Sequence, residues 1–143
     1  MHKEEISELI LLDTHIWLWL MTGSSKAISP KLSGLINRLK ETTSIRVSAI
    51  SAWEVGMLVL KNRISFEAGF KKWIYDASNA PGIGIEPITI EIAMESTLLE
   101  DCHADPADRI LIATAKHIGA TLITHDKEIL SYAKKHRFPA MSL

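Results

Sequence analysis

Apolar and polar residues divide the chain into short apolar runs and longer segments with helical spacing. The run Leu9–Leu12 contains only aliphatic residues, which is typical of a central strand that is buried on both faces of a sheet. Other short runs also have the composition of strands, and the last of them is expected to be a short edge strand. These runs are Ile45–Ser48, Ile83–Ile88, Thr121–Thr124 and Phe138–Met141.

The segments between these runs carry apolar residues three or four positions apart and the usual end signals of helices. Thr14–Met21 is expected to be a helix that Gly23 ends, and Ser29-Pro30 is expected to begin a helix that continues to Leu39. Residues suited to cap or open a helix precede most of the others. The remaining predicted helices run from a Ser51 cap to Lys61, over Phe66–Ala77, from a Thr89 cap through Leu99, from Asp105-Pro106 to Gly119, and from Asp126 through Ala133.

Strands that alternate with helices predict a parallel sheet covered by helices on both faces. The 143 residues, 47% of them hydrophobic, are enough for one α/β domain with a real core, and we assign residues 1–143 to it. The longest apolar stretch, Ile10–Met21, is interrupted by Asp13 and His15 and is too short to cross a bilayer. Residues 1–5 lack the layout of a secretory signal.

Cysteine content and charge add little about function. Cys102 is the single cysteine, so the chain has no internal disulfide and a cytoplasmic location is expected. His103 follows it directly, but adjacent residues rarely form a catalytic pair, and a structural thiol is the favoured interpretation. A net charge of −1, from 16 basic and 17 acidic residues, gives no general support to nucleic-acid binding. Three local basic groups could contact phosphate, although such groups usually solvate a surface. They are Lys61 with Arg63, Lys71 with Lys72, and the segment 134–137.

Acidic residues far apart in the sequence lie where predicted strands end or helices begin. Asp13 follows the first strand, Glu54 lies early in a helix, Asp108 lies in a helix start and Asp126 follows the fourth strand. Because the carboxyl ends of parallel strands share one edge of a sheet, these side chains are expected to converge there. A carboxylate cluster is repulsive alone, but it suits a hard divalent cation such as Mg²⁺ or Mn²⁺.

Each acid also has a structural interpretation. Asp13 and Asp126 are placed to cap the helices that follow them. Asp105 precedes Pro106 and lies three residues before Asp108, a spacing that resembles a capping box. The same spacing aims both carboxylates past the helix start, where both could contact a metal. Glu54 alone could be an ordinary glutamate on a solvated helix face.

Histidine and tryptophan residues flank these acids. His15 and His125 each neighbour a proposed ligand and could touch substrate or support a ligand. Trp17 and Trp19 fall on different faces of the first helix, so at most one of them is expected to be fully buried. Core packing is the default interpretation of both, and base stacking is the alternative.

In their order along the chain, four segments resemble the PIN-domain ribonucleases, specifically the VapC-type toxins of prokaryotic toxin–antitoxin pairs. The match runs nearly from end to end, and the combination is specific although each segment alone is weak. The segments are Leu11–His15 with Leu18-Trp19, then Ser48–Glu54, then His103–Arg109, then Gly119–Asp126.

The resemblance implies a PIN-like three-layer α/β/α fold with a parallel sheet of about five strands. It also implies an endoribonuclease that hydrolyses RNA phosphodiester bonds with Mg²⁺ or Mn²⁺, forms a homodimer and is inhibited by a small antitoxin protein. The family's acidic quartet falls on Asp13, Glu54, Asp108 and Asp126, with Asp105 as a further candidate metal ligand. Trp17 and Met21 are candidate apolar contacts for the antitoxin, and Thr124 or Arg109 could orient the acids or hold a phosphate.

Two other classes of protein compete with this prediction. In a non-nucleolytic metal-binding or phosphoacceptor domain, Asp13 would be a regulatory or nucleophilic aspartate, but no Asp-x-Asp motif accompanies it. A purely structural domain would leave acids at strand ends unexplained. Metal-dependent cutting of RNA separates the nuclease from both.

Overall fold

Five parallel strands in the order β3-β2-β1-β4-β5 form the central sheet of the computed structural model, which describes residues 9–23, 28–42 and 44–143. The first strand pairs with β2 on one side and with β4 on the other, so that Leu11 lies opposite both Arg46 and Leu122. The predicted parallel sheet is therefore confirmed. Its strands are β1 (Ile10–Leu12), β2 (Ile45–Ser48), β3 (Ile83–Glu86), β4 (Thr121–Ile123) and β5 (Ala140–Met141).

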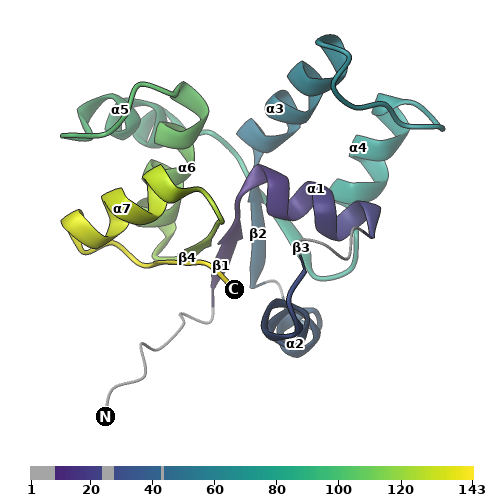
Figure 1. Cartoon of the computed structure of the whole chain (residues 1–143), viewed down its shortest axis with the longest axis horizontal. Coiled ribbons are helices and arrows are strands. Elements are labelled where there is room, and N and C mark those ends of the chain that lie inside the picture. Colours follow the sequence, from purple (N-terminus) through teal and green to yellow (C-terminus); the bar gives the residue numbers. More distant parts are fainter. Residues whose placement is uncertain (1–8, 24–27, 43) are drawn as a thin grey trace.

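Helices cover both faces of this sheet and make the three layers seen in Figure 1. The first face carries α1 (Thr14–Thr22), α2 (Pro30–Leu39), α3 (Ala49–Leu60) and α4 (Phe70–Ser78). The second face carries α5 (Ile90–Leu98), α6 (Pro106–Ile118) and α7 (Lys127–His136). Among the described residues no helix is long and apolar enough to span a membrane.

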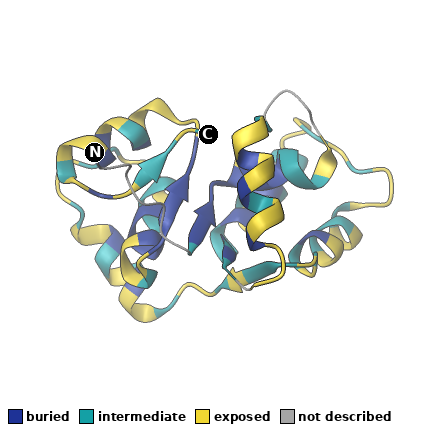
Figure 2. Cartoon of the chain, turned by 90° about the horizontal axis from the view of Figure 1, so that it is seen from below, coloured by how far each residue is buried: buried dark blue, intermediate teal, exposed yellow. Residues whose placement is uncertain are grey.

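Side chains that alternate along β1 divide the core into two clusters. Ile10 and Leu12 pack with residues of α1 to α4, whereas Leu11 packs with residues of α6 and α7. All three side chains are fully buried, and each contributes roughly 1.5–3 kcal/mol of hydrophobic stabilisation. Figure 2 shows the strands as the buried centre between more exposed helices. The aliphatic run that predicted a central strand thus packs against helices on both faces of the sheet.

Most predicted helix ends are confirmed by their caps. Ser29 and Thr89 accept hydrogen bonds from the backbone three residues ahead, at Leu32 and Ile92. Gly23 and Gly119 end α1 and α6 in the left-handed conformation, with φ of 72° and 69°, a conformation that glycine adopts without steric cost. Residues 1–5, which are expected not to form a secretory signal, lie outside the described residues.

Several predicted boundaries are wrong. Ser48, rather than Ser51, is the N-cap of α3, because its extended backbone ends β2 and its hydroxyl accepts from the Ile50 amide. The predicted helix over 66–77 begins only at Phe70, after Gly69 with φ of 91°. Strand β3 ends at Glu86 rather than at residue 88, since Pro87 follows it and proline has no amide hydrogen to donate. The predicted edge strand over 138–141 shortens to Ala140–Met141.

The strand order places a crevice between β1 and β4. From β1 the chain adds β2 and β3 on one side of the sheet and β4 and β5 on the other. In open α/β sheets, ligands bind outside the carboxyl ends of the strands at this reversal of strand order. Asp13 and Asp126 lie there, after β1 and β4 respectively.

Candidate active site

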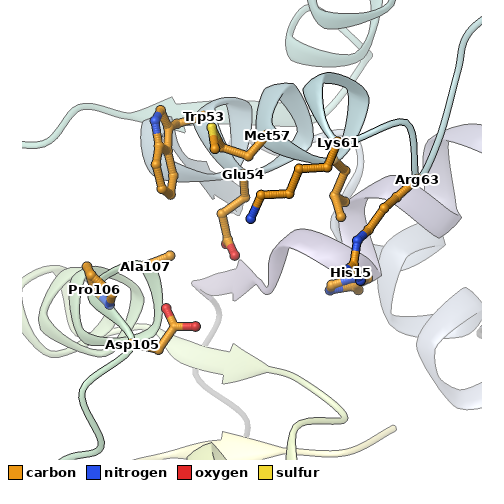
Figure 3. A pocket seen from close by; sticks show the side chains of 10 residues that line it. His15, Trp53, Glu54, Met57, Lys61, Arg63, Asp105, Pro106 and Ala107 are labelled. Carbon is orange, nitrogen blue, oxygen red and sulfur yellow. The ribbon is translucent and has the colours of Figure 1, made fainter.

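The acids singled out in the sequence come together at the carboxyl edge of the sheet. The charges of Asp13, Asp105 and Asp108 all act on Glu54, and those of Asp13, Asp105 and Asp126 act on Asp108. In Figure 3, Glu54 from α3 and Asp105 from the start of α6 face one another across a pocket. The predicted convergence is therefore found, while the catalytic and metal-binding roles of these residues stay predictions.

Asp13 is the most buried acid of the cluster. Its side chain is 8% exposed, and its two oxygens accept hydrogen bonds from different donors. The Thr14 amide donates to Oδ1 over 2.6 Å, and the Thr124 hydroxyl donates to Oδ2 over 2.6 Å. Burial nevertheless raises the pKa of Asp13 above its ordinary value, with a smaller contribution in the same direction from Asp126. Asp13 also caps α1, so the structural and functional interpretations of this residue are compatible.

Glu54 is held by hydroxyl groups rather than by a cation. Thr14 donates from Oγ1 to Glu54 Oε1 over 2.5 Å. The same Thr14 Oγ1 lies 2.7 Å from Ser51 Oγ. Because a hydroxyl has one hydrogen, Ser51 donates to Thr14 while Thr14 donates to Glu54. Burial, followed by the neighbouring carboxylates, raises the pKa of Glu54 to about 7 despite the bond from Thr14. Ser51, which we expected to be a helix cap, belongs instead to this chain of hydroxyls.

Asp108 is paired with a histidine that the sequence did not single out as a site residue. His103 Nε2 lies 2.7 Å from Asp108 Oδ2, and its Nδ1 lies 3.6 Å from Glu128 Oε2. Burial lowers the pKa of His103, but its bond to Asp108 and the surrounding acids outweigh burial and raise it. Burial raises the pKa of Asp108 to about 6, against the lowering effect of His103. The spacing His-x-Asp-Pro-x-Asp over 103–108 was the available signal, because a helix start brings these positions together.

Asp105 and Asp126 are both confirmed as helix caps. The Asp108 amide donates to Asp105 Oδ1 over 3.2 Å. The Glu128 and Ile129 amides donate to Asp126 Oδ1 over 2.8 and 3.1 Å. These bonds orient the two aspartates at the positive ends of α6 and α7. Both side chains are exposed, so capping leaves them accessible to a ligand.

Thr124 and Arg109 have different roles. Thr124 orients Asp13, as one of the two predicted alternatives. The guanidinium of Arg109 is not placed to hold a phosphate. It donates instead to backbone carbonyl oxygens at the end of α5 and in the segment that joins α5 to α6. The acceptors are the carbonyl oxygens of Ser96, Thr97, Leu99, Cys102 and His103. Arg109 is therefore a structural tie, and its predicted contact with phosphate is not supported by this geometry.

A cleft of about 330 Å³ opens beside the acids, between α3 and the start of α6. Lys61 and Arg63 contribute positive charge to its wall, and Trp53 and Met57 contribute apolar surface (Figure 3). Glu54, Met57, Leu58 and Lys61, at spacings of three or four along the chain, thus line this cleft. Basic residues together with carboxylates from both sides, Glu54 and Asp105, suit a polyanion that is bound through a cation.

The donor set fits a hard divalent cation, although the side chains do not form a complete cage. In the described part of the chain, no three His, Cys, Asp or Glu side chains stand ready to share one ion. Glu54 uses one oxygen in its bond with Thr14, and Asp108 uses one in its bond with His103, so a cation or a water can be bound by the other oxygen of each carboxylate. Mg²⁺ retains several waters and commonly uses one or two carboxylates. Burial is the largest cause of the raised pKa values of Asp13, Glu54 and Asp108, and neighbouring carboxylates raise them further.

Comparison with known proteins identifies the family. Residues 10–135 match the model of the PIN domain. The chain belongs to the PIN-domain family. It is 30% identical over 131 residues to Ribonuclease VapC22 of Mycobacterium tuberculosis, a match that covers 91% of this chain and 93% of that protein.

Solved structures share the fold at low sequence identity. VapBC2 of Rickettsia felis, bound to a DNA fragment from its promoter, matches with a TM-score of 0.67 and 12% identity over 93% of this chain and 97% of that one. VapBC-1 of Haemophilus influenzae matches with a TM-score of 0.61 and 17% identity over 94% of this chain and 97% of that one. The predicted three-layer α/β/α fold is therefore confirmed.

Proposed function

We propose that this PIN-domain protein is a divalent-metal-dependent endoribonuclease that acts as the toxin of a toxin–antitoxin pair. The observation that carries the proposal is the meeting of Asp13, Glu54, Asp108 and Asp126 from four separated segments at the carboxyl edge of the sheet. Family membership and the similarity to a VapC ribonuclease support the same activity. A structural domain would gain nothing from carboxylates whose pKa values are raised by burial and by one another.

Asp13 and Asp108 would hold the principal Mg²⁺ or Mn²⁺, with Glu54 and Asp126 completing the site directly or through water and Asp105 at its margin. When bound, the ion would supply a water of lowered pKa as nucleophile and neutralise charge on the phosphoryl oxygens. The protein's own groups prepare this site. Thr14 and Thr124 fix the orientation of Asp13, so one ligand is in place before the ion binds.

Glu54 is a group of this site that can exchange protons near neutral pH. Glu54 has a pKa of about 7 and is oriented by the Thr14 hydroxyl. Its carboxylate can accept a proton from an attacking water, while Oε1 remains hydrogen-bonded to Thr14. His103 keeps Asp108 ionised through its bond to Oδ2. Lys61 and Arg63, which line the cleft, can bind RNA phosphates that flank the cut.

The activity test uses fluorescent single-stranded RNA with Mn²⁺, with Mg²⁺ and with EDTA. The parent protein is expected to cut the RNA only with a metal, and Asp108→Asn and Asp13→Asn are expected to abolish cutting while circular dichroism shows a preserved fold. Glu91→Gln is the matched control, because Glu91 is an exposed acid in the first turn of α5. Cutting by Asp108→Asn at the parent rate, or cutting in EDTA, contradicts the proposal. Labelling of Asp13 by acetyl phosphate without cutting would instead support the phosphoacceptor alternative.

A small antitoxin partner and a homodimer belong to the same proposal. Of the two apolar residues expected to contact an antitoxin, Trp17 is wrong, because it is 1% exposed and packs at a centroid distance of 5.0 Å from Trp73. Trp53, which is 55% exposed at the mouth of the cleft, is a better candidate. On α5, Ile90 and Leu98 are 83% and 66% exposed and would suit an interface between two copies. Copurification from the native host and light scattering test the antitoxin and the dimer respectively.

A further inference from the structure

A second, smaller cavity of about 230 Å³ lies at the reversal of strand order between β1 and β4. It is lined by two acids, Asp13 and Asp126, together with Ile16 and the ring-bearing residues His15, Trp19 and His125. His15 also lines the larger cleft, so the two hollows adjoin at this residue. A ligand that crosses the acidic cluster from the cleft of Lys61 and Arg63 would therefore arrive at the three rings.

The ring of Trp19 lies near the rings of both His15 and His125. The centroid of the Trp19 ring is 5.7 Å from that of His15 and 6.1 Å from that of His125, with interplanar angles of 55° and 43°. All three residues line the smaller cavity, so they are in reach of a ring that enters it. Trp19 is half-buried and the two histidines are exposed. His125 is held from its far edge, because its Nε2 lies 3.1 Å from the Leu143 backbone oxygen.

The size and charge of this cavity select its occupant. Pockets for drug-sized ligands measure roughly 300–1,000 Å³, so about 230 Å³ suits one planar ring system. Asp13 and Asp126 would repel a phosphate placed here, but they would not repel a neutral base. Bases of single-stranded nucleic acids stack on aromatic side chains with little sequence preference.

We propose that Trp19, flanked by His15 and His125, is the stacking platform for the RNA base next to the phosphate that is cut. This inference rests on the proposed ribonuclease function and adds the residues that hold the substrate. The base would enter the smaller cavity while its phosphate lies over the acids. Binding would then favour a single-stranded segment, because a paired base must first be unpaired and unstacked to reach the rings.

The test measures binding by fluorescence anisotropy with Ca²⁺, a divalent cation that also takes oxygen ligands, and a gel confirms that the probes stay intact. Two labelled probes carry the same phosphates: hexaadenylate and a hexamer of abasic ribose. For each protein the base preference is the ratio of the Kd of the abasic probe to the Kd of hexaadenylate. Trp19→Ala is expected to lower this ratio roughly 5- to 150-fold, the range measured for one stacked base, and Trp19→Phe is expected to retain most of it. His15→Ala and His125→Ala are expected to lower it by smaller factors.

Tyr75→Ala is the matched control, because Tyr75 is an aromatic residue of α4 that is 69% exposed and lines neither hollow. Its ratio is expected to equal that of the parent. Trp19 also packs against the core, so circular dichroism and melting confirm the fold, and Trp19→Phe provides a second variant with a smaller change in packing.

An unchanged base preference in a folded Trp19→Ala protein overturns the proposal. A base preference that is lost in Trp53→Ala but kept in Trp19→Ala also overturns it, because the base would then lie in the larger cleft. Failure of the parent to cut RNA with Mn²⁺ would overturn the proposed function separately. A parent that cuts RNA but shows no effect of Trp19 would overturn only the stacking platform.

Discussion

Thr124 donates its hydroxyl hydrogen to Asp13 Oδ2 over 2.6 Å, across 111 positions of sequence. The bond joins the ends of β1 and β4, and it fixes the buried acid on which the site is built. Thr124 Oγ1 also accepts from the Asp126 amide over 3.0 Å. One hydroxyl thus positions two of the proposed metal ligands.

Replacement of this hydroxyl is expected to weaken metal binding. Thr124→Val keeps the shape of the side chain but removes the donor to Asp13. Loss of such a supporting hydrogen bond typically costs 10–100-fold in metal affinity or activity. The measurement is the Mn²⁺ dependence of RNA cutting, and Thr124→Ser, which retains the hydroxyl, is expected to behave like the parent. Equal Mn²⁺ dependence in the valine and serine variants would contradict this role.

The metal-free protein is expected to lose stability as the pH rises from about 4.5 to about 7. Glu54 has its pKa raised from 4.5 to about 7 in the folded state. Between these values the folded state holds more protons than the unfolded state, so the unfolding free energy falls with rising pH. Asp108, raised from 3.8 to about 6, acts in the same direction at lower pH.

Urea denaturation in EDTA at several pH values measures this dependence. Glu54→Gln is expected to flatten the upper part of the curve, and added Mn²⁺ is expected to stabilise the parent more at pH 7.5 than at pH 5. A midpoint that rises with pH over this range in the parent would show that Glu54 is not buried among like charges.

His103 is expected to set the acid limb of the pH–rate profile. Its bond to Asp108 Oδ2 lowers the pKa of that carboxyl, so His103→Ala should raise the pKa further. The acid limb of cutting with Mn²⁺ should then move to higher pH. If the His103→Ala profile overlays that of the parent at all pH values, the bond has no part in preparing Asp108.

Arg109 is expected to matter for stability rather than for RNA binding. Arg109→Lys replaces a fork of donors by one ammonium, which cannot reach the carbonyls of Ser96, Leu99 and Cys102 together. Each hydrogen bond from a charged donor contributes about 1.5–3 kcal/mol, so the unfolding free energy should fall by about that much or more. Normal stability together with weakened RNA binding would return Arg109 to the phosphate contact that the sequence suggested.

Sequence reasoning predicted the sheet because its signals are local. The aliphatic run before Asp13 is typical of a central strand, and Gly23 and Gly119 mark helix ends through their own backbone freedom. The acids could be expected to converge because parallel strands share an edge. The partners of these acids depend on tertiary contacts instead. No pattern connects Thr14 with Glu54, 40 positions away, and the bond from Thr124 to Asp13 appears only when β4 lies beside β1.

The errors have the same origin. Ser48 and Ser51 are both acceptable helix caps, and the extent of β2, which pairs with β3 as far as Ser48, decides between them. Trp17 and Trp19 lie two positions apart, and the sequence shows that their faces differ without showing which face meets Trp73. His103 directly follows Cys102 in the sequence, but its partner in the structure is Asp108, five positions ahead.

The central claim is that carboxylates from separated segments meet around one divalent cation. Anomalous scattering from a crystal soaked in Mn²⁺ tests it most directly. We expect a peak bonded to Asp13 and Asp108, with Glu54 and Asp126 around it, and no such peak in Asp108→Asn crystals. A peak bound elsewhere, or a soaked site in which Glu54 and Asp108 keep their bonds to Thr14 and His103 and no ion enters, would contradict it.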